Sequence, residues 1–101
     1  MSQTKITKSA RGEACTVRIP GICNFNPQTT IFAHINGIRF GHGTGHKVED
    51  LHGAYCCNSC HDVIDARVKT GLHSREAIKL MHYEGVLETQ GKLVEKGLVR
   101  V

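Results

Sequence analysis

The chain has 101 residues, a formal net charge of +4 with its seven histidines neutral, and no tryptophan. So short a chain supports one modest hydrophobic core, which excludes a second independent domain and makes a metal or disulfide crosslink a natural source of added stability. No apolar run is long enough to span a bilayer, so we expect no membrane partner. The basic charge suits DNA, although proteins without that role often carry as much.

Residues 1–12 are polar and contain Lys5, Lys8 and Arg11, which is typical of a flexible basic arm in front of a domain over 13–101. This segment has no apolar stretch of the kind found in signal peptides, so we expect a cytoplasmic protein. Thiols stay reduced in that compartment, and closely spaced cysteines there favour metal binding over disulfides.

Pro20 and Gly21 stand between β-branched residues and predict a tight turn that folds the chain back on itself. The segment TTIFAHI, residues 29–35, alternates in polarity and predicts a strand that carries His34. Residues 36–53 contain five glycines and little apolar periodicity, which indicates a long glycine-rich loop.

Residues 54–56 predict a short second strand, and residues 57–70 predict a helix that stops at Gly71. Ser74 is a suitable N-cap for a C-terminal helix over about 74–96. The apolar positions expected on its buried face are Ala77, Leu80, Tyr83, Leu87 and Val94. The pattern predicts a small α+β domain with a strand–loop–strand–helix core over about 29–70 and an added helix. This helix covers the core or supplies a homodimer interface.

Five cysteines give the chain its strongest chemical pattern. Cys57 and Cys60 form a C-x-x-C pair at a strand-to-helix junction, and Cys15 and Cys23 bracket the predicted turn. Four thiolates make a closed tetrahedral Zn²⁺ site, whose role is structural because no position is left open for water. Cys56 is not one of these four cysteines, and we expect its side chain to face away from them as a small buried hydrophobe.

Two other readings of the cysteines stay open at this point. A C-x-x-C pair also occurs in redox proteins, although the βαβ context of those proteins is missing. The run Cys57-Asn-Ser-Cys60-His61 also satisfies the C-x-x-C-H pattern for covalent haem attachment, which normally follows export.

His34 and His61 are the second chemical pattern, because a hairpin followed by a helix can bring the two imidazoles to one cleft. Phosphodiester hydrolysis requires a base that activates water and a divalent cation that stabilises the developing charge. One histidine for each task would begin such a site. The alternatives are a half-buried strand histidine at position 34 and an ordinary helix N-terminal residue or a further zinc-region ligand at position 61.

These residues resemble the HNH, or ββα-metal, endonucleases. The segment AHI with His34, then Asp50-Leu51, then CNSCH follows the order of that family's pattern. More closely, ARGEACTVRIPGICN, NPQTTIFAHI, GTG and CCNSCHDVID are similar to small nucleases of the YbcO type carried by lambdoid prophages, over about residues 10–65. The resemblance implies a zinc-stapled ββα core that cuts DNA, with His34 as general base and His61 as a ligand of Mg²⁺ or another divalent cation.

The sequence departs from the HNH pattern at two positions. Ala33 stands where many members have an acidic metal ligand, and Asp50 takes the place of the central asparagine, with His52 as its rival. Asp65 lies one helical turn after His61 and is a candidate to complete the metal site. The loop histidines His42 and His46 are further candidates, or else solvated loop residues, and we expect His73 and His82 to be solvated.

Several basic side chains could contact phosphates of DNA, each of them also an ordinary surface charge. They are Arg11, Arg18, Arg39, Lys47, Arg67 and Lys69. Ala33 also keeps a second function open, namely a non-catalytic zinc-stapled DNA-binding or scaffolding module derived from an HNH nuclease.

Overall fold

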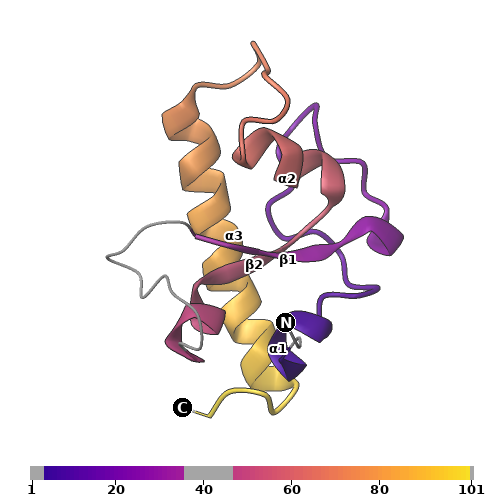
Figure 1. Cartoon of the computed structure of the whole chain (residues 1–101), viewed down its shortest axis with the longest axis vertical. Helices are drawn as coiled ribbons and strands as arrows, with labels where there is room; N and C mark the ends of the chain where they lie inside the picture. The colour runs from indigo at the N-terminus through magenta and orange to yellow at the C-terminus, as the bar shows by residue number, and fades with distance from the viewer. Residues whose placement is uncertain (1–3, 36–46, 101) are drawn as a thin grey trace.

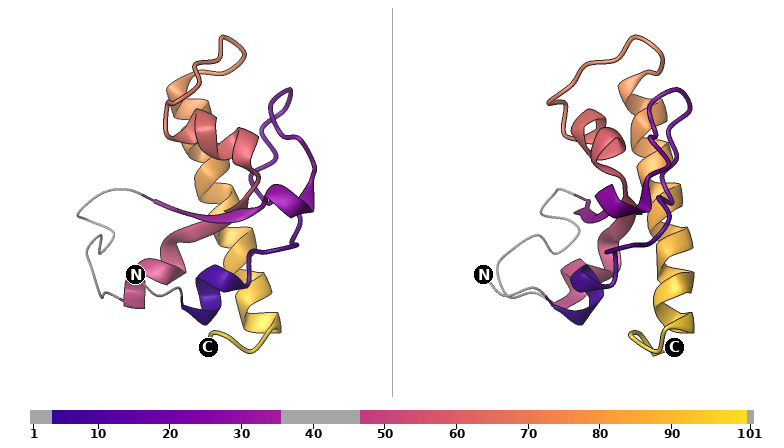
Figure 2. Two further views of the ribbon diagram at one scale, coloured as in Figure 1. Left: turned by 45° about the vertical axis from the view of Figure 1, so that its right-hand side comes forward. Right: turned by 90° about the vertical axis from the view of Figure 1, so that its right-hand side faces the viewer.

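The structure is a computed structural model that describes residues 4–35 and 47–100 (Figure 1). Its elements in chain order are α1 (Lys5–Lys8), the 3-10 helix η1 (Pro27–Thr29), β1 (Ile31–His34), the 3-10 helix η3 (Lys47–His52), β2 (Gly53–Cys56), α2 (Asn58–Ile64) and α3 (Arg75–Glu95). The two strands cross the long helix α3, which lies along one side of the molecule (Figures 1 and 2). The predicted α+β fold with an added C-terminal helix is confirmed.

The strands β1 and β2 form an antiparallel hairpin whose register runs from Ile31 opposite Cys56 to His34 opposite Gly53. All four residues of β2 are buried, because α3 packs against this strand. On the edge of β2 away from β1, the N–H of Thr16 donates to the carbonyl of Tyr55 at 2.8 Å. This bond holds the N-terminal segment beside the hairpin and brings Cys15 next to the start of α2.

The C-terminal helix begins where Ser74 predicts it, since the Ser74 hydroxyl accepts a hydrogen bond from the N–H of Ala77 at 3.0 Å. The predicted buried face, however, was wrong. Leu80 is 58% and Leu87 68% exposed. The core face consists of Ile78, His82, Gly85, Val86, Thr89 and Leu93.

Polar and small residues occupy this face because the N-terminal segment approaches the helix closely. A Cβ atom at Gly85 would lie 2.9 Å from Val17 Cγ2, nearer than real Cβ contacts. The hydroxyl of Thr89 accepts the N–H of Tyr55 at 3.0 Å and lies 3.0 Å from the hydroxyl of Thr16. A pattern that counts only large apolar side chains cannot find such a face.

We expect Thr89→Val to lower the free energy of unfolding by about 1–3 kcal/mol, because it leaves the buried N–H of Tyr55 without an acceptor. Thr89→Ser keeps the hydroxyl and should lose less. Urea unfolding of the two variants beside the parent measures both effects. A valine variant as stable as the serine variant would show that this hydroxyl does not stabilise the packing of α3.

Part of the N-terminal segment forms a short helix beside the hairpin. Residues 5–8 form α1, and the side chain of Thr4 caps it by accepting the N–H of Thr7 at 3.1 Å. Ala10 is buried, and the hydroxyl of Ser9 lies 2.8 Å from that of Tyr55. Both contacts join this segment to a residue far along the chain or to the core that it helps to form.

The helix after β2 and the loop before it also differ from their predictions. Residues 36–46 of the predicted glycine-rich loop, with Arg39, His42 and His46, lie outside the described residues. The remainder of the loop forms η3, and Gly53 is the first residue of β2. The helix predicted to reach residue 70 ends at Ile64, because Ala66 adopts a left-handed backbone with φ of 60°.

Candidate functional site

The four cysteines singled out in the sequence come together at the start of α2. Cys57 is its N-cap and Cys60 lies in its first turn, while Cys15 and Cys23 arrive from the N-terminal segment. Their sulfur atoms all lie within 4.8 Å of one another. The Sγ atoms of Cys23 and Cys57 are 3.8 Å apart, too far for a disulfide bond of about 2.05 Å. These four residues, the cysteine cluster, could hold a metal ion.

Backbone groups surround the cysteine cluster in a way that suits thiolates. The N–H groups of Arg18 and Cys60 point at the sulfurs of Cys15 and Cys57, each at 3.4 Å. Arg18 and Phe25 have positive φ, 44° and 53°, at the turns that follow Cys15 and Cys23. Left-handed backbone is strained in residues with side chains, so its presence after both cysteines indicates that the sulfur positions decide the local fold.

Cys56 does not face away from the cysteine cluster, as the sequence suggested. It is fully buried, as expected, and its thiol donates to the carbonyl of Cys57 at 3.4 Å, but the sulfurs of Cys15 and Cys60 are near enough to act on it. The neighbouring sulfurs of Cys15 and Cys60, together with burial, hold the pKa of Cys56 above its ordinary value, which keeps it a thiol. Burial is also the main cause that raises the pKa of Cys23 to about 11, and a bound cation would reverse this by stabilising the thiolate.

His34 ends β1 and pairs with an acidic residue from η3. Its Nε2 lies 3.1 Å from Oδ1 of Asp50, whose side chain is 12% exposed. The neighbouring carbonyl of Leu51 accepts a hydrogen bond from Gln90 of α3 at 2.6 Å, which ties η3 to the long helix. Asp50 is therefore held in place by its hydrogen bond with His34 and by the bond that ties η3 to α3.

An aromatic contact orients the His34 ring. The centroid of Phe32 lies 5.0 Å from that of His34, with the two rings edge to face. Phe32 lies across Gly53, where a Cβ atom would stand 2.1 Å from the ring. Glycine is thus required opposite His34, because any side chain there would displace the ring that packs against the imidazole.

His61 lies in α2 and is held at both ring nitrogens. Nε2 lies 3.0 Å from Oδ2 of Asp65, one turn later, and Nδ1 lies 2.9 Å from a guanidinium nitrogen of Arg67. Arg67 also contacts Oδ2 of Asp65 at 3.2 Å and Oδ1 of Asp62 at 3.1 Å. Sequence reasoning found Asp65 by its spacing, but it treated Arg67 only as a phosphate contact and did not consider Asp62.

His82 is buried in α3, which corrects the expectation that it is solvated. Its Nε2 donates to the carbonyl of Ala33 at 2.9 Å, directly before His34. Burial lowers the pKa of His82, and His34, His61 and Asp65 all act on it electrostatically. His82 therefore connects α3 to the backbone of β1 directly before His34.

The lowered pKa of His82 predicts that acid destabilises the fold. The native state binds this proton less readily than the unfolded chain does, so the contribution is complete above about pH 6.5 and is lost as the pH falls below it. His82→Gln keeps an N–H donor for Ala33 without a titrating group. Urea unfolding at pH 7.5 and pH 5 should show a larger loss in the parent than in this variant, and equal losses would rule the effect out.

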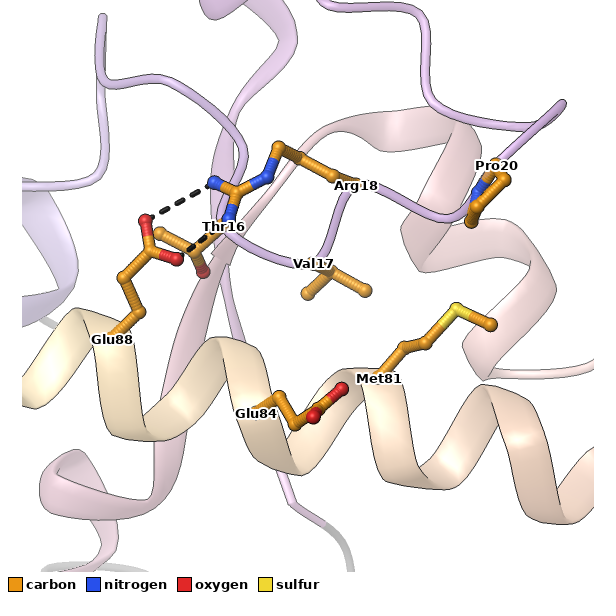
Figure 3. A pocket seen from close by; sticks show the side chains of 7 residues that line it. All are labelled: Thr16, Val17, Arg18, Pro20, Met81, Glu84 and Glu88. Atoms are coloured by element: carbon orange, nitrogen blue, oxygen red, sulfur yellow. Dashed lines mark hydrogen bonds and ion pairs between the residues drawn. The ribbon is translucent and has the colours of Figure 1, made fainter.

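Two of the candidate phosphate contacts come from the N-terminal segment. Arg11 is exposed, whereas Arg18 forms a two-pronged ion pair with Glu88 at 2.7 and 3.1 Å. Arg18 borders a hollow of about 430 Å³ that none of the candidate histidines or aspartates lines (Figure 3). Glu84 and Glu88 also line it, so its acidic wall does not suit DNA. None of the helices in the described residues is apolar and long enough to cross a bilayer.

Comparison with known proteins identifies relatives of this chain. The model of the family described as "Putative nuclease YbcO" matches residues 4–98. Two relatives with that name, from Escherichia coli K12 and from Enterobacteria phage 82, are each 40% identical over 95 residues, covering 94% of this chain and 96% of theirs.

A solved structure has the same fold. It is titled "Structure of a putative bacteriophage protein" from Escherichia coli K-12, and it is 37% identical to this chain. The match has a TM-score of 0.73 and covers 91% of this chain and 99% of that one. Both comparisons extend over nearly the whole chain, and the chain therefore belongs to the YbcO family.

Proposed function

We propose that this protein is a metal-dependent endonuclease that hydrolyses phosphodiester bonds in DNA, through an HNH-type site built on His34 and His61. The observation that carries the proposal is the pairing of each histidine with its own carboxylate, Asp50 and Asp65, in a protein whose relatives are named nucleases. DNA hydrolysis requires a base that activates water and a ligand for a divalent cation, and the two imidazoles, each beside a different carboxylate, can take these two roles.

His34 suits the role of general base. The Asp50 carboxylate accepts a hydrogen bond, so the Nε2 nitrogen of His34 carries the hydrogen and Nδ1 keeps a lone pair that can take a proton from water. The carboxylate stabilises the imidazolium that forms, and the edge of Phe32 holds the ring in one orientation. Asp50 thus stands in place of the asparagine of the HNH pattern, and its function would be to orient His34 and to stabilise its charged form.

His61 and Asp65 suit a divalent cation such as Mg²⁺, because an imidazole nitrogen and a carboxylate oxygen are ligands for such ions. The guanidinium of Arg67 already rests against both side chains, which indicates that this group of donors attracts positive charge. When bound, the cation would stabilise charge on the phosphate and the leaving oxygen. The chain's own part is to hold these two ligands one helical turn apart, 23% and 24% exposed, where a phosphate can reach them.

The cysteine cluster suits a structural Zn²⁺. Zn–S bonds of about 2.3 Å in a tetrahedron place sulfurs about 3.8 Å apart, and the sulfurs of Cys23 and Cys57 have that separation. Four cysteines fill the tetrahedron and leave no position for substrate. Their role would be to fasten the N-terminal segment to α2, the helix that carries His61.

The proposal is tested with purified protein on supercoiled plasmid, single-stranded DNA, branched DNA and RNA, each with added Mg²⁺ or Mn²⁺. We expect cutting of at least one DNA form. Tight DNA binding without any cutting would instead favour the second function, a non-catalytic zinc-stapled DNA-binding or scaffolding module. Ala33 favours that function, because it stands where a third ligand of the catalytic metal would be expected. Gel filtration beside these assays would test the homodimer that double-strand cleavage would require.

A further inference from the structure

Arg67 returns to α2 after the helix has ended. Ala66 adopts φ of 60°, and the N–H groups of Arg67 and Val68 both donate to the carbonyl of Asp62, at 2.9 and 3.2 Å. This left-handed reversal closes the last turn of the helix. It directs the Arg67 side chain back toward the side chains of α2.

The guanidinium of Arg67 then contacts the donor atoms of three residues. Its Nε lies 3.1 Å from Asp62 Oδ1, Nη1 lies 3.2 Å from Asp65 Oδ2, and Nη2 lies 2.9 Å from His61 Nδ1. Two of these three residues are the ligands assigned above to the divalent cation. One positive group therefore already uses the atoms that the cation would need.

The hydrogen bonds also decide which His61 nitrogen is involved. A guanidinium can only donate, so His61 Nδ1 accepts, and the ring proton resides on Nε2, which donates to Asp65. Nδ1 is thus the nitrogen with the lone pair that a metal ion would take. A lone pair that accepts a hydrogen bond from Arg67 cannot bind a metal at the same time.

We propose that Arg67 is a tethered cation that competes with the catalytic divalent metal for His61 and Asp65, so that the metal must displace it. The inference rests on the proposed function, which assigns the metal to these two ligands. Arg67 is 55% exposed, so its side chain has room to move away. Once displaced, it lies beside the metal with its charge available to a DNA phosphate.

The competition weakens the apparent affinity for the metal. A ligand that binds only the fraction of molecules in which its site is free loses affinity in proportion to that fraction. Exposed ion pairs are individually weak, but Arg67 contacts both ligands, so removing it should tighten metal binding about tenfold.

The test measures Mn²⁺ binding to zinc-loaded protein, without DNA, by electron paramagnetic resonance of the free ion. Arg67→Ala should bind Mn²⁺ about tenfold more tightly than the parent, and Arg67→Lys should fall between them because one ammonium cannot contact all three partners. Lys69→Ala is the matched control, since it removes an equal charge two residues away and should change the affinity by less than twofold. His61→Ala added to Arg67→Ala should abolish the tightened binding, which locates it.

Unchanged or weaker Mn²⁺ binding in Arg67→Ala would overturn the inference and leave the proposed function standing. Absence of Mn²⁺ binding in the parent and in every variant would overturn the inference together with the metal site of the proposed function. Zinc content and circular dichroism identify folded samples. If the alanine variant does not fold, Arg67→Lys carries the same test, and binding no tighter than in the parent would contradict the inference.

Discussion

Cys60→Ser is expected to leave the purified protein without stoichiometric zinc and largely unfolded. Cys60 is fully buried in the first turn of α2, and its sulfur is one of four that converge from two segments of the chain. Structural zinc sites contribute about 10 to 16 kcal/mol in small metal-dependent domains, which matches or exceeds the total stability of most domains. Metal analysis and circular dichroism measure the two effects.

Cys56→Ala is the matched control, because Cys56 is just as buried and touches the cysteine cluster without belonging to it. This variant should keep one zinc per chain and lose only a modest part of its stability. The structural role of zinc would be contradicted if Cys60→Ser purified as a folded protein, or if the parent purified without chelators contained far less than one zinc.

His34→Ala is expected to lower the rate of DNA cleavage by about 10² to 10⁴, the usual contribution of a positioned general base. Zinc content and the unfolding transition should change little, since the His34 side chain is 28% exposed and its main partner is Asp50. Single-turnover cleavage by protein in excess measures the rate of the chemical step. A fold that is preserved while the rate falls separates catalysis from stability.

Variants at Asp50 and His73 complete this test. Asp50→Ala should lose about 10- to 100-fold, because the imidazole then lacks the group that fixes its tautomer, and Asp50→Asn should lose less because its amide oxygen still accepts from Nε2. His73→Ala removes a histidine whose Nε2 bonds to the carbonyl of Pro20, away from the candidate site, and should cut at the parental rate. Equal cutting by His34→Ala and His73→Ala would exclude His34 as the base.

The sequence predicted best those features that depend on local chemistry. Ser74 was recognised as an N-cap, and the alternation over 29–35 predicted β1 with His34 at its end. Spacing alone indicated the C-x-x-C pair and the second pair, and all four sulfurs lie together in the structure. Each of these signals uses residues that are close in sequence or unusual in type.

The sequence failed where distant residues determine the structure. The buried face of α3 depends on Gly85 and Thr89, whose partners Thr16 and Val17 lie about seventy positions earlier. His82 is buried because it donates to Ala33, which no pattern around position 82 indicates. In the same way, Arg67 folds back onto His61 only because Ala66 takes up a left-handed backbone.

The most direct measurement is plasmid cleavage by the parent protein at constant zinc content while Mg²⁺ or Mn²⁺ is added. Protein dialysed free of weakly bound metal, with its one zinc retained, should not cut DNA, and its activity should rise and saturate as the second metal is added. That result would separate a structural zinc at the cysteine cluster from a catalytic cation at His61 and Asp65. Equal cutting without added metal, or no cutting of any DNA form at any metal concentration, would contradict this account.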